Sequence, residues 1–421
     1  MFKINGLRWW IIGLIGIATV INYIDRWALA IMWPGIAGDL GLDKGDYAII
    51  LNTFMVAYAL GQMLSGRVFD KVGTRLGYVL SLLVWSTSSM LHSFGRGLVS
   101  FSILRATLGL GEAGNWPGAV KSNAEWFPLR ERAIAQGIFN AGASLGAVVA
   151  PPLIAFLFVA FGWKVTFLIV GSLGFLWLIP WLIINKKQPA NHPWITNAEK
   201  HHICDGKDLS LTASDTKPAP GAFGVLKYRQ SWAVLMGRFF TEPVWFFFMG
   251  WLPVYLYDVY GFDVKQIGMF AWMPYVGAAF GSIAGGWFSG RLLKIGHSVG
   301  FARKGAIIAG AVLMVAGLSG TIFWADTPLK FVPVLATVLF GFQFSISNIQ
   351  TIPSDLFSGK SVGTLAGIGG TVGLSSVILM NFIVPIVTRN SYVPIFTLIA
   401  IFVPLGVLSV LFFGKNIKAL D

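Results

Sequence analysis

The sequence has 421 residues, of which 55% are hydrophobic and only 12% are charged, and its mean hydropathy is +0.71. A soluble domain carries about 25% charged residues, so this composition excludes an ordinary soluble protein and indicates a membrane protein. The net charge of +13 does not point to nucleic acid, because the basic residues stand in short segments between apolar runs.

Twelve apolar runs of roughly membrane-spanning length follow one another along the chain. Continuous apolar runs of this length predict helices rather than strands, whose side chains would alternate between polar and apolar. The sequence therefore predicts an all-α membrane protein with twelve transmembrane helices in two six-helix bundles. The predicted helices cover residues 9–33, 47–68, 76–94, 98–120, 132–156, 164–185, 231–256, 266–290, 303–323, 330–350, 361–386 and 392–413.

The first run carries polar and charged residues near its centre: Asn22, Tyr23, Asp25 and Arg26. No small-residue cleavage site precedes Asp25, so we expect a retained helix rather than a signal peptide. Asn22 and Arg26 are four residues apart and share a helix face. A charge near the bilayer midplane costs roughly 2.5–3.5 kcal/mol on insertion scales, and such residues mark ion or substrate pathways by default.

The fourth run contains a second acid and a second base, Arg105 and Glu112, which are two helical turns apart on one face. One interpretation is a structural salt-bridge network between the first and fourth helices. Buried ion pairs are weak sources of net stability, however, and the polar Tyr58 of the second run adds to the group. The pattern favours a carrier of something charged, in which Arg105 contacts the cargo or orients Glu112.

The segment between the second and third runs, residues 66–75, has the pattern G-x-x-x-D-K-x-G-x-R, with Gly66, Asp70, Lys71 and Arg75 at the fixed positions. A partial copy without the aspartate begins at Gly286, at the equivalent place in the second half. This degenerate repeat predicts two related halves, the architecture of parallel-repeat carriers, whose substrate site lies between the halves.

A polar, proline-bearing linker at residues 186–230 separates an N-terminal half, 1–185, from a C-terminal half, 231–421. Such a short polar tract is usually solvated, so its His192, His201, His202 and Cys204 do not predict a metal site. A single cysteine excludes a disulfide framework. No nucleotide-binding loop or catalytic triad is apparent, so we expect no cofactor and no enzyme activity.

The seventh run holds Arg238 and Glu242, four residues apart, near its predicted cytoplasmic end. The sequence is compatible with two roles for this pair, a structural ion pair and a part in transport. Trp245 and Trp272 either stack on a sugar ring or pack in the core.

The tenth run is unusually polar. Gln343, Ser347 and Gln350 fall on one helical face, while Ser345 and Asn348 fall on another. Their side chains either bind sugar hydroxyls or link neighbouring helices.

The distribution of basic residues predicts the orientation. Of 31 Lys and Arg residues, 22 lie at the termini and in the even-to-odd connections, and six lie in the opposite loops. The positive-inside rule therefore places both termini in the cytoplasm.

The pattern at residues 66–75 resembles the major facilitator superfamily. Within it, the N-Y-I-D-R segment at 22–26, Tyr58, and R-A-T-L-G-L-G-E-A-G-N-W-P-G at 105–118 resemble the anion:cation symporter family. Segments in the second half resemble its hexuronate branch, which carries glucuronate and galacturonate. They are residues 237–247, 251–256 and 362–370. The resemblance covers essentially the whole chain.

The resemblance implies the major facilitator fold and a role for each matching residue. Arg26 would hold the substrate carboxylate with help from Tyr58, and Asp25 and Glu112 would couple transport to protons. The expected substrate-binding residues are Asn22, Tyr23, Arg26, Tyr58, Arg105, Trp245, Gln343, Asn348 and Gln350. The loop with Gly66, Asp70, Lys71 and Arg75 would act as a conformational gate.

The predicted function is therefore proton-coupled import of hexuronates by alternating access. The alternative is symport of another organic anion, such as an aldonate, an aldarate or an aromatic acid. The expected partners are a small sugar acid, protons and the lipid bilayer, with no nucleic acid, and the expected state is a monomer in a bacterial inner membrane. A membrane enzyme would need a nucleophile or metal set, and a sensor would need an added signalling domain.

Overall fold

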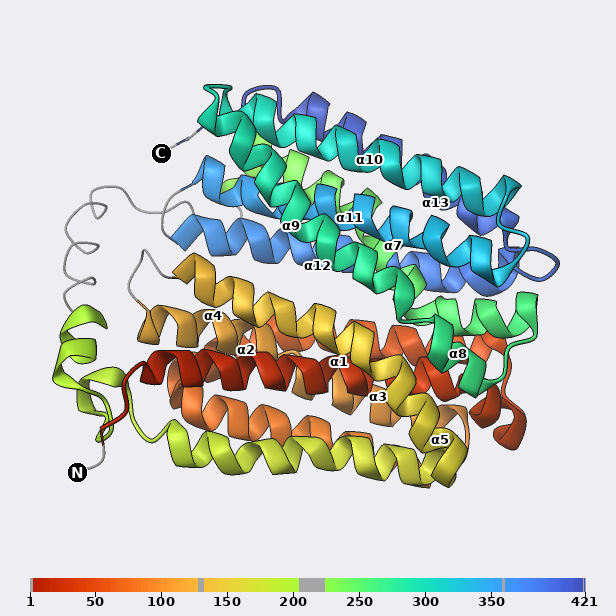
Figure 1. The fold of residues 1–421 in the computed structure, drawn as a ribbon, viewed down its shortest axis with the longest axis horizontal. Helices are drawn as coiled ribbons and strands as arrows, with labels where there is room; N and C mark the ends of the chain where they lie inside the picture. The colour runs from red at the N-terminus through yellow and green to blue at the C-terminus, as the bar shows by residue number, and fades with distance from the viewer. Residues whose placement is uncertain (1–2, 128–131, 204–223, 358–359, 419, 421) are drawn as a thin grey trace. The chain divides into compact units, whose positions relative to one another are not determined.

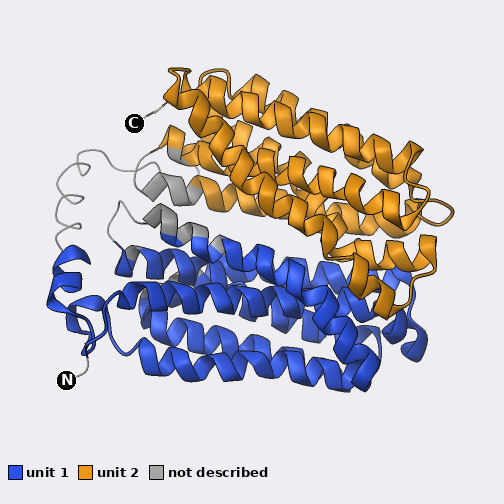
Figure 2. Cartoon of the chain, in the orientation of Figure 1, with its two compact units in different colours: residues 1–217 blue, residues 218–421 orange. Residues whose placement is uncertain are grey.

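The computed structural model describes residues 3–127, 132–203, 224–357, 360–418 and 420. Its named elements are all helices, as predicted, and they run side by side within each part of the chain (Figure 1). The chain divides into two compact units, Met1–Lys217 (unit 1) and Pro218–Asp421 (unit 2), shown in Figure 2. The division falls within the stretch predicted as a linker.

Unit 1 contains fewer and longer helices than the predicted spans suggest, because two of them continue through a bend. Gly73 and Gly162 have positive φ angles of 79° and 73°, a conformation that only glycine adopts readily. The predicted fourth span is interrupted at Ala113 and Gly114. The helices are α1 (Leu7–Leu40), α2 (Lys44–Leu91), η1 (His92–Phe94), α3 (Leu98–Glu112), α4 (Asn115–Trp126), α5 (Arg132–Ile184) and η2 (Pro189–Asn191), followed by a short helical stretch at 197–203.

Helix α1 packs closely against α5 at two glycines spaced as in a G-x-x-x-G motif. A Cβ atom on Gly142 would lie 2.4 Å from the carbonyl oxygen of Gly16, and one on Gly146 would lie 2.5 Å from Cβ of Tyr23. The absence of side chains at these positions sets the distance between the two helices. It also fixes the stretch of α1 that carries Asp25 and Arg26.

Unit 2 is built around α7 and α11. Helix α7 packs against α12 and α13, and α11 packs against α9 and α10. The predicted eighth span is interrupted between two helices at Ala271 and Trp272. The helices are η3 (Val225–Lys227), α7 (Arg229–Tyr260), α8 (Val264–Phe270), α9 (Met273–Lys294), α10 (Val299–Phe323), α11 (Pro328–Leu356), α12 (Lys360–Val387) and α13 (Val393–Phe413).

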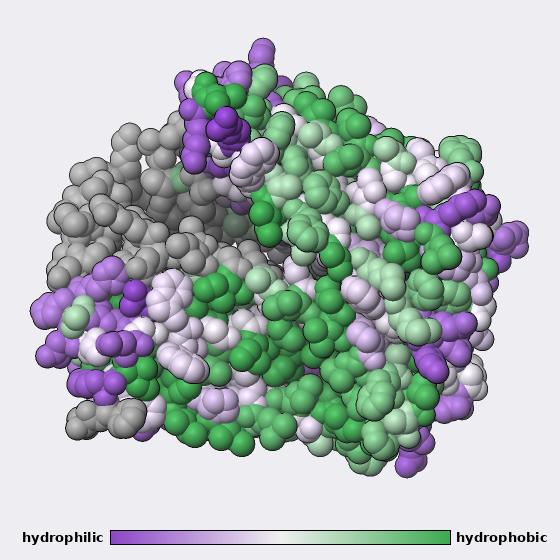
Figure 3. Space-filling model, in the orientation of Figure 1, coloured by the Kyte–Doolittle hydropathy of each residue, from purple (hydrophilic) through white to green (hydrophobic). Residues whose placement is uncertain are grey.

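Seven helical stretches among the described residues are long and apolar enough to cross a membrane. The other predicted spans lie in α2, α3, α4 and α7. Figure 3 shows apolar side chains over the middle of the helices and hydrophilic ones near their ends, as a bilayer requires. The seven are Leu7–Leu40, Ala141–Ile184, Val264–Lys294, Val299–Phe323, Pro328–Pro353, Leu365–Val387 and Val393–Phe413.

The first part of the linker is ordered against the N-terminus of α1, although its polar sequence predicts a solvated tract. The Glu199 carboxylate accepts the backbone N–H groups of Leu7 at 3.0 Å and Arg8 at 3.1 Å, and forms a 2.9 Å ion pair with the Arg8 side chain. Gly6 at the N-cap offers no side chain for this purpose. Glu199 therefore caps α1 from 192 residues away.

His192 of the linker is engaged by the backbone rather than free to bind a metal. The N–H of Trp194 donates to Nδ1 at 3.2 Å, so Nε2 carries the proton and donates to the carbonyl of Ile184 at 2.8 Å. Cys204, which stands near it in the sequence, lies outside the described residues. In the part of the chain that the structure describes, no group of three metal-binding side chains occurs.

Candidate functional site

The four charged residues singled out in the sequence lie within unit 1, on two helices. Asp25 and Arg26 stand at the middle of α1, and Arg105 and Glu112 stand on α3. Their exposed fractions are 1%, 9%, 2% and 0%, so the unit buries two acids and two bases almost completely. Such a group is expensive in a membrane protein unless its members pair or bind something polar.

Arg26 and Glu112 form the central contact of this cluster. Nε of Arg26 donates to Oε2 of Glu112 at 2.7 Å. Aromatic rings surround the guanidinium: its central carbon lies 4.6 Å from the ring centre of Tyr58, 5.4 Å from that of Tyr23 and 5.5 Å from that of Phe54. These rings attract the cation through their π faces and hold the planar group in a fixed orientation.

The second acid, Asp25, is held by a different helix. The hydroxyl of Ser89 on α2 donates to Oδ1 of Asp25 at 2.5 Å. Arg105 interacts electrostatically with Glu112, Asp25 and the phenol of Tyr47. The two acids and the two bases therefore act as one electrostatic group, which carries no net charge when all four are ionised.

Several polar atoms of the group have no hydrogen-bond partner within the described part of the chain, although they are buried. A buried polar atom without a partner costs about 1–3 kcal/mol, so a concentration of them marks a place for water or a polar ligand. Asn22, also fully buried, lies beside Glu112. The atoms without partners are Oδ2 of Asp25, Nη2 of Arg26, Nε and Nη2 of Arg105, and Oε1 of Glu112.

Two glycines of the L-G-L-G-E segment bring Glu112 to this position. A Cβ atom on Gly109 would lie 2.6 Å from the carbonyl oxygen of Phe54, and one on Gly111 would lie 2.7 Å from the backbone nitrogen of Trp85. Both neighbours belong to α2, so α3 approaches α2 closely here. The end of α3 at Glu112 then places the carboxylate beside Arg26 of α1.

His92 is a buried ionisable residue near this site that sequence reasoning missed. Its exposed fraction is 0%, its Nδ1 lies 2.7 Å from the carbonyl oxygen of Ser88, and its ring stacks on Phe167 at 5.0 Å. It also lies within electrostatic reach of Arg105. A lone histidine at the end of an apolar run gives no distinctive signal in a sequence, which explains the omission.

The structure describes only part of the predicted gate. Lys71 and Arg75 are exposed, and Arg75 donates to the carbonyls of Lys186 at 3.2 Å and Leu182 at 3.3 Å, at the end of α5. A cation at a helix C-terminus satisfies carbonyls that lack helical partners. Gly66 and the side chain of Asp70 lie outside what the structure describes, and the gate remains a prediction.

In unit 2, the two predicted faces of the polar α11 have different environments. Gln343 and Ser347 are half-buried and Gln350 is exposed, so this face is accessible. Ser345 and Asn348 are each 1% exposed. The hydroxyl of Ser345 donates to the carbonyl of Ile307 on α10 at 2.8 Å. The buried face therefore links helices, and the accessible face is the one available to a ligand.

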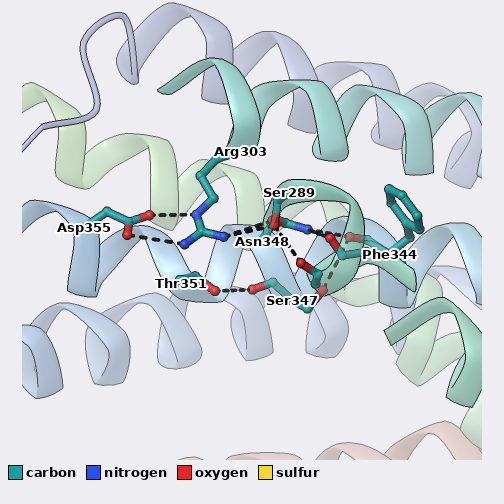
Figure 4. Close-up of polar contacts among 9 residues, drawn as sticks. Ser289, Arg303, Phe344, Ser347, Asn348, Thr351 and Asp355 are labelled. Carbon is teal, nitrogen blue, oxygen red and sulfur yellow. Dashed lines mark hydrogen bonds and ion pairs between the residues drawn. The ribbon is translucent and has the colours of Figure 1, made fainter. Parts of the chain in front are cut away.

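Asn348 belongs to a polar network that joins three helices of unit 2 (Figure 4). Its amide donates to the carbonyl of Gly285 on α9 at 3.2 Å, and its oxygen accepts from Arg303 at 3.4 Å. Arg303 of α10 also donates to Ser289 at 3.1 Å and to Asp355 of α11 at 2.9 Å. These contacts favour the interhelical role for Asn348 over substrate binding.

Trp245 lies in the aromatic core of unit 2. It stacks on Phe342, with ring centres 5.6 Å apart, and meets the edge of Tyr275 at 5.3 Å. Its exposed fraction is 7%. This geometry favours packing over stacking on a sugar, which stays a prediction.

The chain is similar to known proteins over most of its length. Residues 15–381 match the family model described as Major Facilitator Superfamily. The chain is 32% identical to the hexuronate transporter of Escherichia coli (strain K12), an alignment that covers 100% of this chain and 97% of that protein. It is 34% identical to the galacturonate transporter of Dickeya chrysanthemi, over 75% of this chain and 91% of that protein.

A solved structure shows the same fold. The crystal structure of a bacterial homologue of the human lysosomal transporter Spinster matches with a TM-score of 0.70 and 16% sequence identity. The match covers 98% of this chain and 96% of that one. At this identity the likeness establishes the fold and nothing about the cargo.

Proposed function

The chain belongs to the Major Facilitator Superfamily, so it is a multi-pass membrane transporter and not an enzyme, and on this premise we propose that it imports hexuronates such as glucuronate and galacturonate together with protons. The observation that carries the proposal is the buried contact between Arg26 and Glu112 in a cluster with unpartnered polar atoms. The two relatives that transport hexuronate or galacturonate support the substrate class.

Arg26 offers the chemistry that a sugar acid requires. A guanidinium binds a carboxylate through two parallel hydrogen bonds, and Nη2 of Arg26 is a buried donor without a partner. Glu112 already occupies Nε. The substrate carboxylate therefore competes with Glu112 for Arg26, while the rings of Tyr58 and Tyr23 keep the guanidinium in place.

The charge of the cluster supplies the reason for proton coupling. Asp25, Glu112, Arg26 and Arg105 together carry no net charge when ionised, so one added carboxylate leaves a buried negative charge. Such an uncompensated charge is costly. A proton on Glu112 or Asp25 removes it and, in the case of Glu112, frees Arg26 for the substrate. Loss of that proton returns Glu112 to Arg26 and weakens substrate binding.

The sugar hydroxyls need hydrogen-bonding groups that do not carry charge. In unit 2 the accessible face of α11 presents two amides of this kind, on Gln343 and Gln350. We assign these residues to hydroxyl recognition. Asn22 and Arg105 of unit 1 complete the set of polar groups proposed to contact the substrate.

The decisive experiment is uptake of radiolabelled glucuronate and galacturonate into proteoliposomes, with and without an inward proton gradient. We expect accumulation that needs the gradient and stops when a protonophore is added, and competition by either uronate but not by neutral galactose. Accumulation that persists with the protonophore contradicts proton coupling. Uptake of an aldonate, aldarate or aromatic acid in place of both uronates supports the alternative, another organic anion.

The proposed location is a bacterial cytoplasmic membrane, with both termini and the linker on the cytoplasmic side. Cys204 is the only cysteine in the sequence and stands in the linker, which makes it a natural reporter. In intact spheroplasts, a membrane-impermeant maleimide should label Cys204 only after permeabilisation. Labelling of intact cells at the same rate would reverse the assigned orientation.

A further inference from the structure

Unit 2 contains an arginine–glutamate pair with the same kind of contact as the pair in unit 1. Oε1 of Glu242 accepts from Nε of Arg238 at 2.9 Å and from Nη2 at 2.7 Å. The single glutamate oxygen thus lies against the Nε–Nη2 edge of the guanidinium. That edge is one of those by which an arginine holds a bound carboxylate.

We propose that Arg238 is a second carboxylate-binding residue of this transporter, and that Glu242 is an internal carboxylate that occupies it when no cargo is bound. The ligand is the single carboxylate of a sugar acid, which Arg238 holds at a different step of transport from Arg26. This inference rests on the proposed function and extends it to unit 2. Two carboxylates on one guanidinium edge repel each other, so the cargo displaces Glu242 rather than joining it.

The exposure of the pair supports this role. The side chains of Arg238 and Glu242 are 17% and 9% exposed, against 6% and 0% for Arg26 and Glu112. Lipid does not solvate charge, so a partly exposed ion pair on a transmembrane helix faces water or a polar ligand. The pair in unit 2 is therefore the more accessible of the two.

Two glycines of α12 let the pair lie close against the backbone of this helix. A Cβ atom on Gly370 would lie 3.4 Å from Nη1 of Arg238, and one on Gly373 would lie 2.7 Å from Cγ of Glu242. The carbonyl of Ala366 accepts from Nη1 of Arg238 at 3.1 Å, which fixes the far end of the guanidinium. One edge is thereby anchored to backbone, and the other is held only by a side chain that can rotate away.

The surroundings of the pair offer Glu242 no other basic partner among the described side chains. Helix α13, which packs on α7, carries no ionisable residue, and Arg303 of α10 is already bound to Asp355 of α11. The order arginine then glutamate at this spacing is also the less favourable one for stabilising a helix. The pair thus has the properties of an exchangeable site.

The test is galacturonate binding to the purified protein, measured by titration calorimetry, with thermal unfolding as a stability readout. Arg238→Gln should weaken binding by about tenfold or more, because a hydrogen bond to a charged group contributes about 1.5–3 kcal/mol. Exchange of the pair, Arg238→Glu with Glu242→Arg, keeps an ion pair. This exchanged variant should regain the unfolding temperature that Arg238→Gln loses, but it should not regain wild-type affinity for galacturonate.

The matched control is Asp326→Asn, because Asp326 and Lys330 form an exposed ion pair with the same spacing in the same unit. It should bind galacturonate as the wild type does. If the exchanged pair recovers both stability and affinity, the pair is structural and the inference is overturned. Wild-type affinity in Arg238→Gln would also overturn it. If the wild-type protein binds no sugar acid at all, the proposed function fails, and this inference with it.

Discussion

Nε of Arg26 lies 2.7 Å from Oε2 of Glu112, and this hydrogen bond joins the middle of α1 to the last residue of α3. Glu112 occupies Nε of Arg26 through this bond. In the proposed mechanism a substrate carboxylate can take its place. In that mechanism, protonation of Glu112 and binding of a substrate carboxylate to Arg26 both break this bond, so each of them favours the other.

Replacing Glu112 with glutamine should separate exchange from proton-driven accumulation. Glutamine keeps the size of the side chain and can still accept from Arg26, but it cannot take up a proton. We expect substrate exchange between equal pools to continue, while accumulation on a proton gradient falls by about tenfold or more. Counterflow and gradient-driven uptake in the same proteoliposomes measure the two quantities. Accumulation equal to that of the wild type would remove Glu112 from the coupling mechanism.

Replacing Arg26 with lysine should weaken substrate binding although the positive charge is kept. Lysine cannot form the two parallel hydrogen bonds of a guanidinium, nor present a flat cation to the ring of Tyr58. The loss of one charge-assisted bond predicts a Kd for galacturonate that is about ten- to a hundredfold higher. Calorimetric titration measures it. An unchanged Kd would mean that Arg26 does not contact the carboxylate.

Replacing Gly146 with alanine should destabilise unit 1 and disturb the site. The added methyl group would lie 2.5 Å from Cβ of Tyr23, and overpacking of this kind costs about 1–3 kcal/mol. Thermal unfolding in detergent measures the effect. Gly13→Ala is the matched control, because Gly13 is in α1 with nothing within 4 Å of its Cβ position, and it should be neutral or slightly stabilising.

Replacing Glu199 with glutamine should lower stability without changing substrate affinity. The variant loses the ion pair with Arg8 and the negative charge at the N-terminus of α1, a loss of about 1 kcal/mol. Thermal unfolding measures the first effect and galacturonate titration the second. Lys200→Gln, at the exposed neighbouring position, should leave both unchanged. A weaker affinity in Glu199→Gln would show that the linker acts on the site itself.

His192 should make the linker contact sensitive to acid. Burial lowers the pKa of His192 below its usual value of 6.5, so the folded protein keeps the ring neutral where the unfolded chain takes up a proton. The contribution of His192 to the free energy of unfolding is therefore fully present above about pH 6.5, and it declines as the pH falls toward the lowered pKa. Unfolding temperatures at pH 8 and pH 5.5 should differ less in His192→Gln than in the wild type. His297→Gln, at an exposed position, should not change that difference.

The sequence predicts the helical fold and the charged cluster well, because both depend on strong local signals. Asp25, Arg26, Arg105 and Glu112 interrupt apolar runs, where charge is costly, and all four lie in one cluster. The periodicity of α11 also distinguishes the accessible face with Gln343 from the buried face with Asn348.

Other features depend on contacts between distant parts of the chain, which local patterns do not encode. The bends at Gly73 and Gly162 join pairs of predicted spans into single helices. The packing of Trp245 on Phe342 follows from the meeting of α7 and α11. His92 approaches Arg105 only because α2 and α3 lie together.

The contact between Glu199 and the start of α1 has a consequence for biosynthesis. The ribosome makes α1 first, yet the carboxylate that satisfies its leading N–H groups emerges 192 residues later, after α5. During synthesis those N–H groups rely on water or headgroups until the linker arrives. Completion of unit 1 thus coincides with the emergence of the linker, before any helix of unit 2 has been translated.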